Sequence, residues 1–210
     1  MVRIACISDT HGQHSELALP EADLLIHAGD FMVSGKRLGE ITSFNMWLEQ
    51  TGYSKVVVVP GNHEVLFETD PGMAKVSLTN AQCLIQSGVE IAGLKVWGSP
   101  YNVEFNDWAF NVPRNAIGRY WELIPEGLDV LITHYPPYGI LDQYEDGVHT
   151  GCESLAKAVQ RAKPKVHIFG HVHWSGGKSV RIGDTLYLNA SVVDSDLHCT
   201  GAPQVIEVGV

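Results

Sequence analysis

This sequence lacks the signals of several protein classes. No apolar run reaches the roughly 18 residues that a membrane span needs, and the N-terminus, MVRIACISDTHG, shows no signal-peptide cleavage region. The four cysteines are scattered and form no CxxC pair, so a zinc ribbon is excluded and core packing in a reducing compartment is expected. We therefore expect a cytoplasmic protein without a membrane partner.

Basic residues are scarce as well. The chain of 210 residues carries 14 Lys and Arg against 24 Asp and Glu, a formal net charge of −10. Because affinity for nucleic acid depends largely on Lys and Arg contacts to phosphate, we expect no polymeric nucleic-acid partner. A small anionic substrate is still compatible with this charge, because a metal ion reverses the local electrostatics.

A single domain over residues 1–210 is predicted, because no repeat, low-complexity tract or linker interrupts the chain; the oligomeric state is left open. Short apolar runs have the composition of strands buried on both faces. They cover residues 2–7, 24–28, 55–59, 128–133, 165–169 and 185–188. Helical spacing of apolar residues predicts helices between them, over 36–50 and 151–163. Strands alternating with helices indicate an α/β fold, in which ligands collect beyond the carboxyl ends of the strands.

Polar side chains stand at five of these strand ends. They are Asp9, His11, Asp30, Asn62, His63, His134, His171 and His173. Carboxylate, amide and imidazole groups without a thiolate suit divalent manganese, iron, zinc or cobalt. Seven ligands are too many for one ion, but two half-shells that share one carboxylate would use them all. If FGHVH stays extended, His171 and His173 share one side while Val172 points away.

The ordered motifs SDTHG, GD, GNHE, THYPP and GHVH resemble those of the calcineurin-like metallophosphoesterases, over roughly residues 2–193. The similarity is strongest to the small metallophosphoesterase-domain phosphodiesterases, which share stretches like GSPYNVEFNDWAFN, the GC before residue 153 and the NAS at 189–191. The resemblance implies a four-layer α/β/β/α sandwich of two stacked mixed sheets flanked by helices.

The resemblance also implies roles for the polar side chains. The first ion would be held by Asp9, His11, Asp30 and His173, and the second by Asp30, Asn62, His134 and His171. Asp30 would bridge the ions and, with His63, count as catalytic. His63 would bind no metal; it would stabilise transition-state charge or protonate the leaving oxygen. The expected ions are manganese first, with iron, zinc or cobalt as alternatives.

The expected reaction is hydrolysis of a small phosphodiester, with a cyclic nucleotide as the first candidate, by in-line attack of a hydroxide that bridges the ions. One alternative is a phosphomonoesterase or protein phosphatase with the same site. Another is a catalytically weak scaffold protein, which the complete GHVH motif disfavours.

Other residues near the motifs carry weaker predictions. His27 and His167 are expected to be buried structural histidines, and His14 a solvated loop histidine or, as the alternative, a residue at the mouth of the site. Glu64 would orient His63 or cap the following helix, and Asn189 would support the site or form a turn.

Aromatic residues in the predicted loops would stack on a substrate base or anchor the loops to the core. They are Tyr101, Trp108, Phe110, Tyr135 and Tyr138. Tyr135 stands where many relatives have glycine, and its bulk is expected to narrow the pocket.

Overall fold

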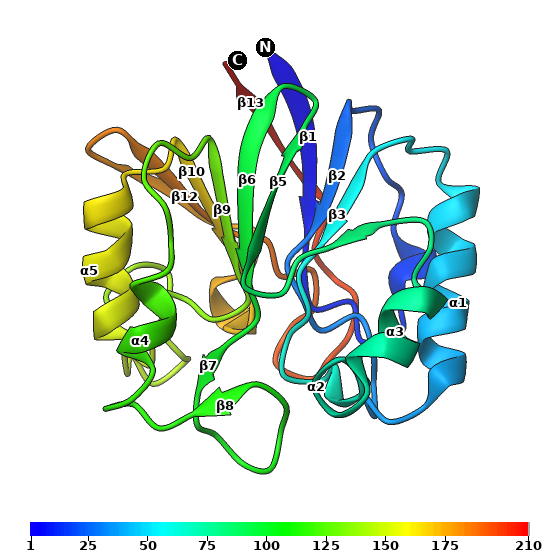
Figure 1. The fold of residues 1–210 in the computed structure, drawn as a ribbon, viewed down its shortest axis with the longest axis horizontal. Helices are drawn as coiled ribbons and strands as arrows, with labels where there is room; N and C mark the ends of the chain where they lie inside the picture. Colours follow the sequence, from blue (N-terminus) through cyan, green and yellow to red (C-terminus); the bar gives the residue numbers. More distant parts are fainter. Residues whose placement is uncertain (210) are drawn as a thin grey trace.

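Two mixed sheets pack face to face in the computed structural model, which describes residues 1–209 (Figure 1). The first sheet has the order β13 (Gln204–Val208), β1 (Val2–Ile7), β2 (Leu24–His27), β3 (Val56–Val58) and β4 (Gln82–Cys83). The second has the order β11 (Ser179–Ile182), β12 (Thr185–Asn189), β10 (Val166–Phe169), β9 (Val130–Thr133), β6 (Leu94–Ser99) and β5 (Ser87–Ile91). A short pair, β7 (Asn102–Val103) and β8 (Asn111–Val112), lies apart from both.

Helices cover the outer face of each sheet (Figure 1). Beside the first sheet lie α1 (Leu38–Gln50), α2 (Val65–Thr69) and α3 (Pro71–Ser77), and beside the second lie α4 (Gly118–Trp121) and α5 (Glu153–Ala162). Two 3-10 turns, η1 (His14–Glu16) and η2 (His173–Ser175), complete the elements. The predicted four-layer sandwich is confirmed.

Burial explains why the strands are so apolar. Ile26 and Val57 of the first sheet meet Ile132 and Ile168 of the second in one fully buried cluster. The opposite face of each sheet is covered by its helices, so both faces of the central strands are removed from water. In α1 the spaced residues Ile41, Phe44 and Leu48 pack in the cluster between this helix and the first sheet, whereas Leu38 at its first turn is exposed.

Parallel pairing brings the polar strand ends together. β1, β2 and β3 run parallel in one sheet, and β9, β10 and β12 run parallel in the other. The structured strands are shorter by one or two residues than the predicted runs at 24–28, 55–59, 128–133 and 165–169. β2 and β3 end one residue before the predicted runs do, whereas β9 and β10 begin later than predicted and end where predicted. The loops that follow these strands meet along one rim of the molecule (Figure 1).

Candidate metal centre

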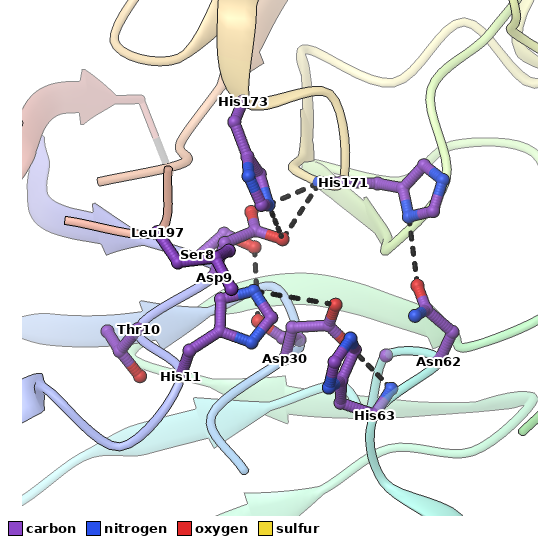
Figure 2. Close-up of polar contacts among 12 residues, drawn as sticks. Ser8, Asp9, Thr10, His11, Asp30, Asn62, His63, His171, His173 and Leu197 are labelled. Atoms are coloured by element: carbon purple, nitrogen blue, oxygen red, sulfur yellow. Dashed lines mark hydrogen bonds and ion pairs between the residues drawn. The ribbon is translucent and has the colours of Figure 1, made fainter. Parts of the chain in front are cut away.

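A cavity of about 530 Å³ opens at this rim. Six of the predicted polar residues line it: His11, Asp30, Asn62, His63, His171 and His173. Asp9 and His134 lie beneath its floor, where both are fully buried. Figure 2 shows side chains from four separate loops pointing toward one another around the two carboxylates.

The two carboxylates anchor two groups of imidazoles. Asp9 Oδ1 lies 3.5 Å from His173 Nε2, and Asp30 Oδ2 lies 3.3 Å from His134 Nε2 and 3.9 Å from His11 Nε2. Ligand atoms of Asp9, His11 and His173 come within 4.8 Å of one another, as do those of Asp30, His134 and His171. A further group joins His11, Asp30 and His63. Asp30 thus takes part in two of the three groups.

The donor atoms fit divalent cations. His134 Nδ1–H donates to the Ala28 carbonyl (2.9 Å), so its Nε2 offers a lone pair. His134 Nε2 lies 3.0 Å from Asn62 Oδ1, which is itself 2.9 Å from His171 Nδ1. His11 is buried, and neither of its ring nitrogens has a hydrogen-bond partner within residues 1–209. Because unpaired buried polar atoms are costly, a cation is the group that would satisfy this set.

The electrostatics suit the same purpose. Burial opposes ionisation of both carboxyls, yet His173 holds the pKa of Asp9, and His134 that of Asp30, well below the usual range. Burial lowers the pKa of His171 to about 3, which keeps that ring neutral. Burial also disfavours charge on His134, but the nearby Asp30 raises its pKa to about 9, so near neutral pH a bound cation would have to displace the proton on Nε2. Ionised carboxylates and available imidazole lone pairs are what metal binding requires.

The loops take unusual backbone angles to present these groups. Asp9, His11, Asp30 and His171 adopt positive φ angles of 56°, 41°, 58° and 67°. Such left-handed conformations are disfavoured for residues with a Cβ, so surrounding contacts must hold them.

Motif glycines leave room for the ligands. A Cβ on Gly61 would overlap Asp30 Oδ1, and one on Gly170 would overlap Asp9 Oδ2. The glycines of GNHE and GHVH are therefore required by close approach of a carboxylate.

Glu64 has a different role from the predicted ones. It neither orients His63 nor caps α2 with its side chain. Its buried carboxylate accepts hydrogen bonds from the N–H groups of Gly61 (2.5 Å), Asp30 (2.8 Å) and Met32 (2.9 Å). Burial first, and the charge of Asp30 second, raise the pKa of Glu64 to about 8. Glu64 ties the loop after β3 to the loop after β2.

His63 is held by its neighbours with one nitrogen free. Its backbone N–H donates to Asp30 Oδ1 (2.8 Å), and its Nδ1–H donates to the Val33 carbonyl (2.7 Å). The ring stacks on Trp108, with centroids 3.9 Å apart and planes at 24°. Since Nδ1 is engaged, Nε2 is the atom left to act at the cavity.

The segment FGHVH does not stay extended, so the condition for its alternating side chains is not met. β10 ends at Phe169, His171 takes a positive φ and His173 begins η2. Both rings still reach the site, because the His171 N–H donates to both oxygens of Asp9 (3.1 and 3.0 Å). Asn189 supports this loop by donating to the Val172 carbonyl (2.9 Å), one of its two expected roles.

Of the remaining histidine predictions, two are confirmed and one is wrong. His27 and His167 are fully buried as expected, and each shares a hydrogen bond with a threonine hydroxyl. His14 was predicted to be solvated, and this is wrong: its ring is buried against Phe44 and Trp47, with centroids 5.2 and 5.0 Å away. The following helix covers His14, which no local pattern indicates.

Among the five predicted aromatics, only Trp108 lines the cavity. Tyr135 does not narrow it: the ring is buried beside His171, and its hydroxyl donates to the Thr150 carbonyl (2.7 Å). Sequence reasoning missed three aromatic wall residues, Phe105, Tyr144 and Trp174. The one available signal was that Trp174 directly follows GHVH.

Comparison with known proteins places this arrangement in a class. TT1561 of Thermus thermophilus has a similar fold, with a TM-score of 0.61 at 14% sequence identity, covering 90% of this chain and 88% of that one. Metallophosphoesterase domain-containing protein 1 of Homo sapiens is 37% identical over 232 residues, covering 98% of this chain and 71% of the relative; its Mus musculus counterpart gives the same values. Fold, donor set and relatives together define a metal-dependent phosphoesterase.

The family follows from the sequence match. The model of the calcineurin-like phosphoesterase family matches residues 2–175, which include the carboxyl ends of β1, β2, β3, β9 and β10. This chain belongs to the calcineurin-like phosphoesterase family. No helix within residues 1–209 is long and apolar enough to cross a membrane.

Proposed function

We propose that the protein is a dinuclear metal-dependent phosphodiesterase formed by one domain over residues 1–210. The first ion is assigned to Asp9, His11, Asp30 and His173, and the second to Asp30, Asn62, His134 and His171. The observation that carries this proposal is the convergence of four imidazoles, including the unpaired ring of His11, on two ionised carboxylates at one cavity. Manganese is the proposed ion, with iron, zinc or cobalt as alternatives.

When bound, the two ions supply positive charge to the phosphoryl oxygens and lower the pKa of water. The chain supplies the remaining chemistry. With Nδ1–H held by the Val33 carbonyl, His63 can deliver a proton only from Nε2. Trp108 fixes the ring plane by stacking, so that His63 would meet the leaving oxygen in one orientation. In this proposal His63 is the general acid.

A small phosphodiester fits the cavity better than a phosphomonoester or a phosphoprotein. No lysine or arginine is among the residues that line it within the described chain, and a monoanionic diester needs no cation beyond the ions. A monoester dianion carries an additional charge that the wall does not neutralise. Cyclic nucleotides are the first physiological candidates that we propose.

A scaffold without catalysis is disfavoured because all seven proposed ligands are present and brought together. We also propose a cytoplasmic location, supported by four cysteines that form no disulfide.

The test compares a phosphodiester with a phosphomonoester that releases the same leaving group, p-nitrophenol. Protein loaded with manganese should bind about two ions per chain and hydrolyse bis-p-nitrophenyl phosphate with higher kcat/KM than p-nitrophenyl phosphate. The same preparation is then assayed with cyclic nucleotides. A preference for the monoester would favour the phosphomonoesterase, and absence of both bound metal and hydrolysis would favour the scaffold.

A further inference from the structure

One wall of the cavity lies outside the proposed metal centre. It is formed by residues from three loops: Phe105 and Trp108, Tyr144, Glu145 and Asp146, and Trp174. None of these is a proposed metal ligand. A substrate whose phosphorus lies at the ions can place one of its two ester substituents against this wall, while Ser195 and Leu197 complete the lining beside the proposed ligands.

The wall is held in place by a buried carboxylate. Asp142 is fully buried, and its Oδ2 accepts hydrogen bonds from the N–H groups of Gly139 and Gly151 (2.9 Å each). Its Oδ1 pairs with His149 Nδ1 at 2.5 Å. These bonds close the loop that carries Tyr144, Glu145 and Asp146 at both of its ends. The Ser175 hydroxyl also donates to the Gln143 carbonyl (3.3 Å), which joins this loop to the segment carrying Trp174.

The charge of the wall is negative only. Glu145 has no hydrogen bond or ion pair within residues 1–209, so its carboxylate is free to meet a ligand. Asp146 uses one oxygen to accept from the Val148 N–H (3.0 Å) and keeps the other. No lysine or arginine of the described chain lines the cavity. An anionic substituent would therefore be repelled here.

The remaining surface of the wall is aromatic. Phe105, Tyr144 and Trp174 are 55%, 40% and 47% exposed, although large aromatic rings are usually buried. Aromatic faces attract organic cations, and nearby carboxylates add to that attraction. Exposed rings in one cavity with two carboxylates that have no cationic partner are the composition of a binding site for an alkylammonium group.

We propose that this wall binds an ammonium-bearing substituent, so that the enzyme selects phosphodiesters that carry a positive charge beside the phosphate. This inference rests on the proposed phosphodiesterase function and adds a substrate class to it. The ammonium group lies between the exposed aromatic rings and the carboxylates of Glu145 and Asp146. The phosphate lies at the proposed metal centre.

The test uses two probes of equal shape. p-Nitrophenyl phosphorylcholine carries a trimethylammonium group, and p-nitrophenyl 3,3-dimethylbutyl phosphate replaces its nitrogen by carbon. Both release p-nitrophenol, so only the charge differs. Cation–π contacts together with exposed ion pairs correspond to a preference of about tenfold in kcat/KM for the choline ester. This preference should fall as ionic strength rises.

Variants assign the preference to the wall. Glu145→Gln combined with Asp146→Asn should reduce the ratio between the two esters to about twofold or less. Glu122→Gln combined with Glu126→Gln removes the same two negative charges from exposed residues that precede β9, at the other end of the strand from the site, and should keep the wild-type ratio. A ratio of one or below in the wild type overturns the proposal. An unchanged ratio in the double variant overturns the assignment to these carboxylates.

A binding measurement separates this inference from the proposed function. Calorimetry of the metal-loaded protein with phosphocholine and with 3,3-dimethylbutyl phosphate reads the same preference without turnover. If bis-p-nitrophenyl phosphate is not hydrolysed but phosphocholine binds about tenfold more tightly, the phosphodiesterase proposal is wrong and the cation site stands. Equal binding of both ligands, with hydrolysis of the diester, rejects the cation site alone.

Discussion

Replacing Glu64 tests how the two central loops are held. Its Oε2 accepts from the N–H groups of Gly61 and Asp30, and its Oε1 accepts from Met32. In Glu64→Gln the amide oxygen can keep two of these bonds, while the amide NH₂ must face the third N–H. One buried N–H loses its acceptor, which costs about 1–3 kcal/mol. Glu64→Ala leaves three such groups unpaired and costs roughly 3–9 kcal/mol by the same measure.

These losses are large against a typical domain stability of about 5–15 kcal/mol. Urea unfolding of the metal-free protein, followed by circular dichroism, measures the change in the free energy of unfolding. Metal affinity should also fall, by about 10–100-fold in Glu64→Gln, because the loop that carries Asp30 loses its support. Calorimetric titration with manganese measures this second effect.

Glu90→Gln is the matched control, because Glu90 is an exposed glutamate on β5. It should change the unfolding free energy by less than about 0.5 kcal/mol. If Glu64→Gln is as stable as this control and binds manganese equally well, Glu64 does not support the site and our interpretation of its three hydrogen bonds is wrong.

Four further predictions concern the reaction and the stability of the fold. His63→Ala should slow esters with poor leaving groups by about 10²–10⁴-fold and p-nitrophenyl esters much less; equal losses would remove His63 from the acid role. Asp30→Ala should abolish activity and manganese binding, so a variant that keeps both ions and near-normal turnover would refute the bridging assignment. Burial lowers the pKa of His167 to about 3 against about 6.5 when unfolded, so the unfolded state binds more protons between these values. Stability should therefore decline as pH falls from about 6.5 toward 3, and His167→Leu should make the decline in urea titrations shallower. Tyr135→Phe should leave KM unchanged and lower the free energy of unfolding by about 0.5–1.5 kcal/mol, because the hydrogen bond to the Thr150 carbonyl is lost. A changed KM would show that Tyr135 contributes to the substrate pocket after all.

Local sequence patterns were sufficient to predict the strands and the kinds of residues at their ends. An apolar run such as Val2–Ile7 can only be accommodated where both of its faces are buried, and parallel strands bring their carboxyl ends to one rim. The proximity of Asp9 to His171, which are 162 positions apart, follows from that topology and from the family resemblance. The sequence also shows the glycines of the motifs, but it does not show that carboxylates approach them too closely for a Cβ.

Tertiary structure alone decided how the loops are held and what faces the substrate. The sequence does not show that Glu64 would bond to Met32, because the two lie on loops after different strands. Periodicity predicted an extended GHVH, but contact with Asp9 selects a positive φ at His171.

The wall of the cavity depends on structure for the same reason. Tyr135 donates a hydrogen bond to the Thr150 carbonyl and does not line the cavity, while Tyr144 and Trp174 line it from segments joined through Ser175. Composition and spacing therefore determined the class of fold and the chemistry available at the strand ends. The packing of distant loops, which no local propensity encodes, decided which side chains face the substrate.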